Sequence, residues 1–333
     1  MRLAYETIEL QLWHTFHIAH GASATRRNVV VQLDDGLGEA APVAYHGESA
    51  EGVSAALERW RPDVQQLDDP AAIMWLLRKL DGSRAARAAV DLALHDALGK
   101  RLGAPLYEIL GLSKLPLPPT SFTIAITAPD QLVERVEAAA VYPILKVKLG
   151  ADRDLDIVRT IRATAPDATI RVDANAAWTV DQALTLIPQL AELGVELVEQ
   201  PLAVGDEDGL RQLKAARLPV PLIIDESVKS PADVVRLADA VDGVNIKLMK
   251  TGGIQGALAA IQTARSCGLK VMLGCMVETS LGATAAAQIA GLADWVDLDG
   301  PLLIANDPFV GVQFSGAQLT LPNGPGLGVT HRS

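Results

Sequence analysis

Short apolar segments recur through the later part of the chain, and stretches with the periodicity of amphipathic helices separate them. Their spacing of roughly 25 residues is typical of parallel β-α-β units. The eight segments cover residues 121–126, 144–149, 169–174, 196–200, 221–226, 243–248, 270–275 and 295–300. Helical patterns at 129–140, 154–165 and 180–194 lie between them. The pattern predicts an α/β fold with eight parallel strands.

Eight such units favour closure of the sheet into a barrel. An open, doubly wound sheet is the alternative, but no glycine-rich dinucleotide fingerprint follows the first predicted strand. We therefore expect a barrel.

The residues before about position 115 follow a mixed pattern of strands and helices. Residues 28–36 (NVVVQLDDG) read as a strand that ends in a turn. Residues 83–103 read as a long helix, with Ser83 as its N-cap and Gly103 at its C-terminal end. The PLPP sequence at 116–119 is typical of a linker. These features predict a separate α+β domain ahead of the barrel.

Composition and charge narrow the possible partners. The chain of 333 residues has 29 Lys and Arg against 40 Asp and Glu, and this net charge of −11 argues against nucleic acid. The first residues lack the apolar core of a signal peptide, and no apolar run approaches the roughly 18 residues of a membrane span. The two cysteines, Cys267 and Cys275, make no disulfide framework. We expect a cytoplasmic protein that acts on a small molecule, with no membrane partner.

Charged residues stand at the C-terminal ends of the predicted strands, where barrel enzymes carry their chemistry. Lys146 and Lys148 share one face of their strand because side chains alternate along it. Counted from Lys148, the next charged positions follow at intervals of 25, 26, 26 and 22 residues, and the last strand adds two acids. They are Asp173, Glu199, Asp225, Lys247, Asp297 and Asp299. A charged residue that recurs at the same position of each β-α unit is not the pattern expected of a solvent-exposed face.

Three of these residues are acids on adjacent strands. Asp173, Glu199 and Asp225 should converge at the barrel mouth, where they would repel one another unless a cation lies between them. An all-oxygen ligand set without His or Cys suits a hard ion, above all Mg²⁺. The alternative is that each acid caps the helix that follows it.

The lysines lie on strands that a ring of eight would place opposite each other. Lys148 on the second strand and Lys247 on the sixth would then flank a substrate at the mouth. Lys146 should lower the pKa of Lys148, because a neighbouring ammonium disfavours the protonated form, and so prepare it as a base. For Lys247 or Lys250, an ordinary surface lysine is the alternative.

Together, the lysines and acids suit the removal of a proton next to a carboxylate. A divalent ion can stabilise the resulting enediolate, and two bases on opposite faces can remove and return the proton with inversion. The layout therefore predicts an epimerase or racemase.

These motifs resemble the muconate-lactonizing-enzyme subgroup of the enolase superfamily. The matching residues are Lys146-Val147-Lys148, Asp173 in RVDAN, Glu199 in VEQP, Asp225 in IDES and Lys247 in NIKLMKTGG. Within the subgroup, Asp297 and Asp299 in VDLDGPLL are similar to the Asp-x-Asp of the dipeptide epimerases, where the pair holds the substrate's α-ammonium group. A turn-forming pair is the alternative interpretation of these two residues.

The resemblance implies a particular architecture and mechanism. Residues 1–117 would be a capping domain, 118–320 a modified (β/α)₇β TIM barrel, and 321–333 a tail packed back on the cap. One Mg²⁺ would be held by the three acids, and Lys148 and Lys247 would exchange the Cα proton of a dipeptide's C-terminal residue. A homo-oligomer is expected. The alternatives are a cycloisomerase or o-succinylbenzoate synthase-type lyase, and an inactive small-molecule-binding barrel.

The cap loops and the neighbours of the acids supply further candidates. Epimerases selective for L-Ala-L-Glu carry an arginine in a cap loop, and Gly21 falls where that arginine would lie. In the second cap loop, Glu48 and Glu51 are candidates to contact a polar or cationic side chain. The residues expected to support the metal acids and the site are Asn175, Gln200, Glu226 and Glu278.

Overall fold

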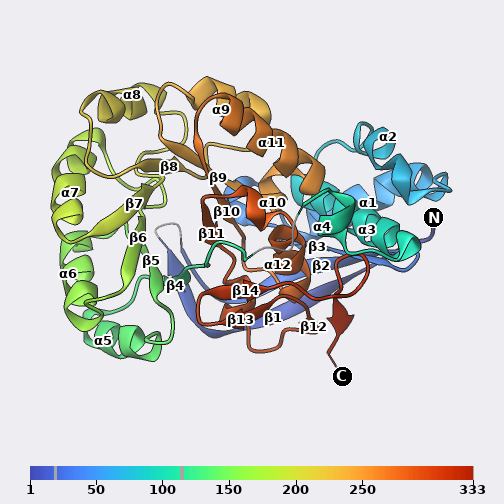
Figure 1. Cartoon of the computed structure of the whole chain (residues 1–333), viewed down its shortest axis with the longest axis horizontal. Coiled ribbons are helices and arrows are strands. Elements are labelled where there is room, and N and C mark those ends of the chain that lie inside the picture. The colour runs from blue at the N-terminus through green and yellow to red at the C-terminus, as the bar shows by residue number, and fades with distance from the viewer. Residues whose placement is uncertain (19–20, 113–115, 333) are drawn as a thin grey trace.

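The computed structural model describes residues 1–18, 21–112 and 116–332, and its first unit is a three-stranded antiparallel sheet. The strands are β1 (Leu3–Ile18), β2 (Gly21–Leu33) and β3 (Gly36–Ala40). The helical segments that follow are η1 (Ala44–His46), α1 (Ala50–Gln65), η2 (Pro70–Ala72), α2 (Ile73–Leu77), α3 (Arg84–Leu102) and α4 (Leu106–Ile109). Figure 1 shows this cap beside the larger barrel.

Helix α3 is the central helix of the cap. Its start is fixed by Ser83, whose hydroxyl accepts a hydrogen bond from Ala86 N, and its end by Gly103 in the left-handed conformation. An alanine-rich face of α3 packs on β3, where a Cβ on Gly38 would lie only 2.0 Å from Ala89 O. Glycine is therefore required at position 38 for the helix to approach the sheet this closely.

Eight parallel strands form the second unit, in the order of the chain. Their bounds are β4 (Phe122–Ile124), β5 (Ile144–Lys148), β6 (Thr169–Asp173), β7 (Val195–Glu199), β8 (Leu222–Ile224), β9 (Gly243–Lys247), β10 (Lys270–Gly274) and β11 (Trp295–Asp297). The two ends of the sheet meet where Thr120 bridges Val296 and Ser121 N donates to Val296 O. The sheet is a closed barrel, so the predicted fold class is confirmed and the open sheet is wrong.

Helices cover the outside of the barrel (Figure 1). They are α5 (Pro129–Ala138), α6 (Asp154–Thr164), α7 (Val180–Glu192), α8 (Glu207–Ala215), α9 (Pro231–Leu237) and α11 (Ile254–Ser266). The helices α10 (Leu248–Thr251) and α12 (Ser280–Ala287) also contact the cap, at α3 and β3, and η3 (Ala290–Leu292) follows α12. After β11 the only helical segment among the described residues is the short η4 (Gly300–Leu303), and β1 bridges to Ile304 through Leu12. The cap sheet thus reaches the barrel where an eighth helix would lie.

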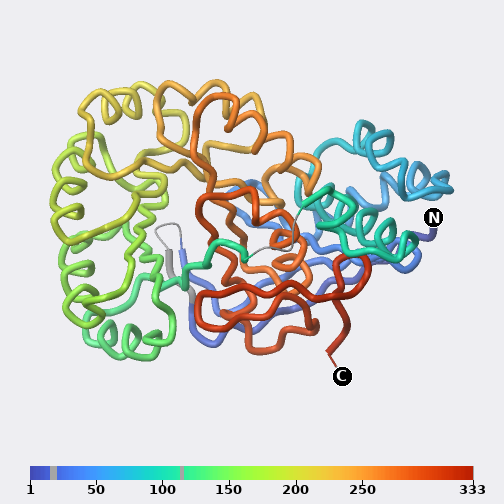
Figure 2. Tube along the Cα trace, in the orientation of Figure 1, coloured from blue at the N-terminus to red at the C-terminus, as the bar shows by residue number. Residues whose placement is uncertain are grey.

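The C-terminal segment runs back across the molecule (Figure 2). It contains the short strands β12 (Phe309–Val310), β13 (Gln313–Ser315), β14 (Gln318–Thr320) and β15 (Thr330–His331). Gly326 O accepts a hydrogen bond from Leu106 N, and Leu327 N donates to Asp96 Oδ1, each at 2.8 Å. The end of the chain therefore contacts α3 and α4 of the cap. No helix in the described ranges combines the length and the apolar character needed to cross a bilayer.

Candidate active site

The parallel register brings charged residues from neighbouring strands to one level. Lys148 lies opposite Asp173 across β5 and β6, and Asp173 lies opposite Glu199 across β6 and β7. Asp225 directly follows β8. All four side chains are buried. The barrel therefore gathers one lysine and three acids at its C-terminal end.

These acids do not cap the helices that follow them. Helices α7, α8 and α9 take their N-caps from Thr179, Asp206 and Ser230. The capping interpretation of the acids is therefore wrong.

Lys247 ends β9, which lies four strands from β5 in the ring of eight. Lys148 and Lys247 thus approach the mouth from opposite sides. Both line a pocket of about 120 Å³, together with Lys146, Asp297 and Asp299. A small substrate in this pocket would lie between two amino groups.

Lys146 lies among the carboxylates. Its Nζ is 2.8 Å from Glu199 Oε2, 2.8 Å from Asp297 Oδ2 and 3.2 Å from Asp173 Oδ2. Burial alone would lower the pKa of Lys146, but the charges of Asp297, Glu199 and Asp173 raise it well above its ordinary value. Lys146 is therefore a buried counter-ion of the acids.

Lys148 forms an ion pair with Asp173. Lys148 Nζ lies 2.7 Å from Asp173 Oδ2. Although burial opposes ionisation, the ammonium groups of Lys148 and Lys146 hold the pKa of Asp173 at about 2. Burial and the charge of Asp173 instead raise the pKa of Glu199 to about 7. Glu199 is therefore the acid of this cluster that most readily holds a proton, and a bound cation would favour its ionised form.

Asp225 binds two lysines. Lys247 Nζ lies 2.8 Å from its Oδ2 and Lys250 Nζ lies 2.5 Å from its Oδ1. Although burial opposes ionisation, these two cations hold the pKa of Asp225 well below its usual range. Both lysines are buried. The interpretation of Lys247 or Lys250 as an ordinary surface lysine is therefore wrong.

The donor set fits a hard divalent cation. Asp173, Glu199 and Asp225 offer only oxygen. Asn175 Oδ1 and Glu226 Oε2 are buried and have no hydrogen-bond donor among the described residues, and a cation or its water ligands would satisfy such oxygens. In the same ranges, no three His, Cys, Asp or Glu side chains have the geometry of a formed metal site. Lysine ammonium groups pair with the three acids instead.

Hydrogen bonds from polar neighbours hold Asp173 and Asp225 in position. Asp173 Oδ1 accepts from Asn175 N at 2.9 Å, and Asn175 Nδ2 donates to Glu226 Oε1 at 3.1 Å. Gln200 Oε1 accepts from Asp225 N at 3.0 Å. Asn175 and Gln200 both have positive φ, of 44° and 34°, a conformation that costs free energy in residues other than glycine. The chain leaves regular strand geometry at these positions to hold the acids.

Asn245 is a supporting residue that sequence reasoning missed. Its Nδ2 donates to Glu199 Oε1 at 2.8 Å from within β9. It stands two positions before Lys247 and therefore on the same face of the strand. An Asn-x-Lys pattern in an otherwise apolar strand was the available signal.

Asp297 and Asp299 both line the pocket at the seam of the barrel. Asp297 Oδ1 accepts from Ser121 Oγ at 2.7 Å, and Asp299 Oδ2 accepts from Thr123 N at 2.6 Å. Burial and the charge of Asp297 raise the pKa of Asp299 to about 7. Both carboxylates are buried and directed inward, so they are not a solvent-exposed turn pair.

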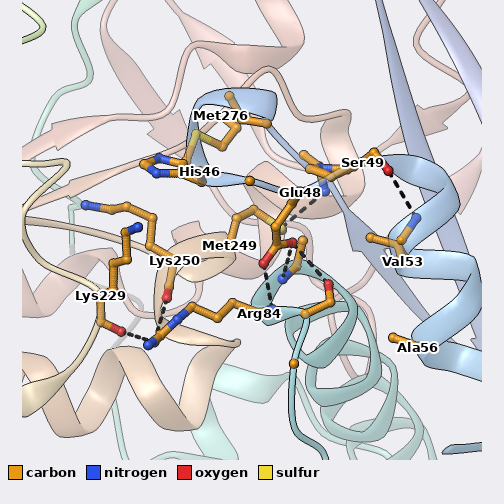
Figure 3. A pocket seen from close by; sticks show the side chains of 18 of the residues that line it. His46, Glu48, Ser49, Val53, Ala56, Arg84, Lys229, Met249, Lys250 and Met276 are labelled. Carbon is orange, nitrogen blue, oxygen red and sulfur yellow. Dashed lines mark hydrogen bonds between the residues drawn. The ribbon is translucent and has the colours of Figure 1, made fainter. Parts of the chain in front are cut away.

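The three cap-loop candidates lie away from this pocket. Glu48 accepts hydrogen bonds from Ser83 Oγ, Arg84 N and Ala85 N at the start of α3 (Figure 3). It lines a neighbouring hollow of about 400 Å³, which shares Val43, His46 and Met276 with the pocket but does not bring Glu48 into it. Glu51 is exposed and pairs with Arg27. Gly21 is exposed, with φ of 142°, and among the described residues no atom beyond its chain neighbours lies within 4 Å of the place that a Cβ would take.

Other cap residues form the roof of the pocket. They are Arg26 of β2 and Val43, Tyr45 and His46 around η1. Arg26 is partly buried, and its Nη1 donates to Thr25 O at 3.1 Å. Burial lowers the pKa of His46 to about 4, so its imidazole is neutral at pH 7. Glu278 lies just outside the pocket, where one of its oxygens accepts from Met276 N.

A closed barrel with a cap, three acids at its mouth and lysines on opposed strands defines an enzyme of the enolase type. Two family models match the chain accordingly. The model described as Mandelate racemase / muconate lactonizing enzyme, N-terminal domain, matches residues 5–111, and the one described as Enolase C-terminal domain-like matches residues 130–333. The chain belongs to this mandelate racemase/muconate lactonizing enzyme family.

Similar proteins carry epimerase names. The L-Ala-D/L-Glu epimerase of Bacteroides thetaiotaomicron is 40% identical, over 99% of this chain and 88% of that protein. The substrate-liganded L-Ala-D/L-Glu epimerase of Bacillus subtilis superposes with a TM-score of 0.93 at 31% identity, covering 100% of this chain and 99% of the other. The dipeptide epimerase of Enterococcus faecalis V583, complexed with Mg and L-Leu-L-Tyr, gives 0.92 at 31% identity, with 99% of each chain covered.

Proposed function

We propose that the protein is a Mg²⁺-dependent dipeptide epimerase that inverts the Cα of the C-terminal residue. The observation that carries this proposal is the pocket that joins Lys148 and Lys247, from opposite strands, with the paired acids Asp297 and Asp299. Similarity to proteins named as dipeptide epimerases supports the same activity.

Mg²⁺, held by Asp173, Glu199 and Asp225, would stabilise negative charge on the substrate's carboxylate. The two lysines transfer the proton. Lys148 or Lys247, in its neutral form, takes the Cα proton from one face and leaves the enediolate form of the dipeptide. The lysine opposite, in its ammonium form, gives a proton to the other face. One proton is removed and one returned, so the reaction is an isomerisation.

The remaining groups orient the substrate. Asp297 and Asp299 bind its α-ammonium group by charge-assisted hydrogen bonds. Lys146 balances part of the charge of Glu199 and Asp297 and lowers the pKa of Asp297. Arg26, in the roof of the pocket, would attract a carboxylate in the side chain of the C-terminal residue. The proposed enzyme therefore prefers a dipeptide with an acidic C-terminal residue. Position 21 is a glycine, so Arg26 takes the role that an arginine at that position would have.

The test is a set of L,L-dipeptides incubated with the enzyme and Mg²⁺ in D₂O. Mass spectrometry should detect one deuterium at the Cα of the C-terminal residue, and chiral chromatography the L,D epimer. Removal of metal with EDTA should stop both processes, and added Mg²⁺ should restore them. Absence of exchange on every dipeptide would favour an inactive binding barrel, and elimination or cyclisation products would favour a lyase.

We further propose the division into a cap (1–117), a barrel (118–320) and a tail (321–333). The separate matches at 5–111 and 130–333 and the hydrogen bonds of Gly326 and Leu327 to the cap support it. A homo-oligomeric state and a cytoplasmic location remain predictions.

A further inference from the structure

A second hollow adjoins the catalytic pocket on the side of Asp299. It has a volume of about 270 Å³ and lies between β1, β4, the end of α5 and η4. Thr123 and Leu303 line both spaces. The two spaces are therefore neighbours at the seam of the barrel.

The walls of this hollow are largely apolar. Phe122 and Tyr142 stack with ring centroids 4.2 Å apart and an interplanar angle of 4°. Ile124 and Leu302 add aliphatic surface, and Trp13 stands at the edge with 63% of its surface exposed. A largely apolar hollow beside a few convergent polar groups is typical of a ligand site.

The hollow is joined to the ammonium-binding acids through Thr123. Its backbone N–H donates to Asp299 Oδ2 at 2.6 Å, while the residue itself lines the hollow. A ligand whose ammonium group is held by Asp297 and Asp299 thus has its first Cα next to the rim. The side chain on that Cα is the part of a dipeptide within reach of the apolar walls.

We propose that this hollow, lined by Trp13, Phe122, Ile124, Tyr142 and Leu302, binds the side chain of the dipeptide's N-terminal residue and selects a large apolar one. The inference rests on the proposed dipeptide epimerase function. It adds that the enzyme prefers L-Leu or L-Phe over L-Ala at the N-terminal position, whereas several similar proteins carry names that begin with L-Ala. The preference arises because a larger side chain removes more apolar surface from water.

The experiment compares kcat/KM for L-Ala-L-Glu, L-Leu-L-Glu and L-Phe-L-Glu, measured by deuterium exchange with Mg²⁺. The wild-type enzyme should favour L-Leu-L-Glu or L-Phe-L-Glu by at least about tenfold. Ala138 lines the hollow from the exposed end of α5, so Ala138→Phe should fill it with little risk to folding. This variant should lose at least about tenfold more activity on L-Phe-L-Glu than on L-Ala-L-Glu.

Trp13→Ala removes one wall and should reduce the same preference. Trp75→Ala is the matched control, because Trp75 is also exposed but lies on α2, outside both spaces. Trp75→Ala should leave the ratio of kcat/KM values for the three dipeptides unchanged. An enzyme that exchanges dipeptides but favours L-Ala-L-Glu, or whose preference survives Ala138→Phe, would overturn the subsite and leave the epimerase proposal intact. Absence of exchange on all three substrates would instead contradict the proposed function.

Discussion

At the scale of single residues, two carboxyl groups are buried where the cap meets the barrel. Glu39 accepts from Thr279 N, Thr279 Oγ1 and Gly282 N at the start of α12. Glu278 has only one bonded oxygen, and Oε2 has no donor among the described residues. Burial, followed by the charge of Glu39, raises the pKa of Glu278 from 4.5 to about 8. The folded protein therefore holds Glu278 in its protonated form at neutral pH.

This raised pKa predicts a loss of stability with rising pH. Between pH 4.5 and pH 8 the folded state binds a proton that the unfolded state has released, so the free energy of unfolding falls across this window. Glu278→Gln is neutral throughout and should reduce the fall, by a few kcal/mol at most (about 1.4 kcal/mol per pKa unit). Urea denaturation at pH 5.5 and pH 8 measures the difference.

The control for that experiment is Glu137→Gln on α5, because Glu137 is exposed. It should keep the wild-type dependence on pH. An equal fall in the Glu278→Gln variant would show that Glu278 ionises normally in the folded protein.

Asp299 provides a second prediction at this scale. Asp299→Asn keeps an oxygen for the Thr123 N–H but removes a charge facing the substrate's ammonium group. We expect kcat/KM for a free dipeptide to fall about 100-fold, because one partner of a desolvated charge pair is lost. The N-acetylated dipeptide, which has no ammonium group, should be equally poor for both enzymes. Unchanged activity on the free dipeptide would show that Asp299 does not bind the ammonium group.

At the scale of elements, the sequence predicted the barrel strands closely, and it predicted the cap loops poorly. A strand end such as Asp173 is fixed by the period of its own unit and by the parallel register, both of which are visible in the sequence. The surroundings of Glu48 depend on α3, whose start lies more than 30 residues further along the chain. Local patterns contain no information on that contact.

Lys250 shows the same limit within the barrel. It follows Lys247 by three residues and lies in the short helix α10. Its burial follows from the packing of α10 against α3, α11 and β9, and its Nζ contacts Asp225 and Asn245 O. No periodicity in the sequence distinguishes it from a surface lysine.

Helix α3 gives a prediction for Glu48. Glu48→Ala removes the acceptor of two backbone N–H groups and one hydroxyl at the start of α3. The free energy of unfolding should fall by about 1–2 kcal/mol, while the ratio of kcat/KM values among dipeptides stays constant. Glu51→Ala, in the first turn of α1 and exposed, should leave the substrate ratio unchanged and lower the free energy of unfolding by less than Glu48→Ala does. If the ratio of kcat/KM values changed while the stability did not, Glu48 would be a substrate-binding residue.

At the scale of the whole molecule, neither unit forms the site alone. The barrel supplies the acids and lysines, and the cap supplies the roof with Arg26 and His46. The hydrogen bonds of the C-terminal segment to α3 and α4 tie the two units together. Catalytic chemistry could be predicted from the sequence because it resides on regular strands, whereas selectivity depends on loops from two units.

The central claim is that Lys148 and Lys247 serve opposite faces of one Cα. The most direct test is deuterium exchange in D₂O by Lys148→Ala and Lys247→Ala, each given the L,L and the L,D epimer of one dipeptide. Each variant should lose epimerisation but still exchange the Cα proton of one epimer, and the two variants should retain opposite epimers. If both variants exchange the same epimer, or if either still interconverts the two at the wild-type rate, the two lysines do not divide the proton transfer between the faces.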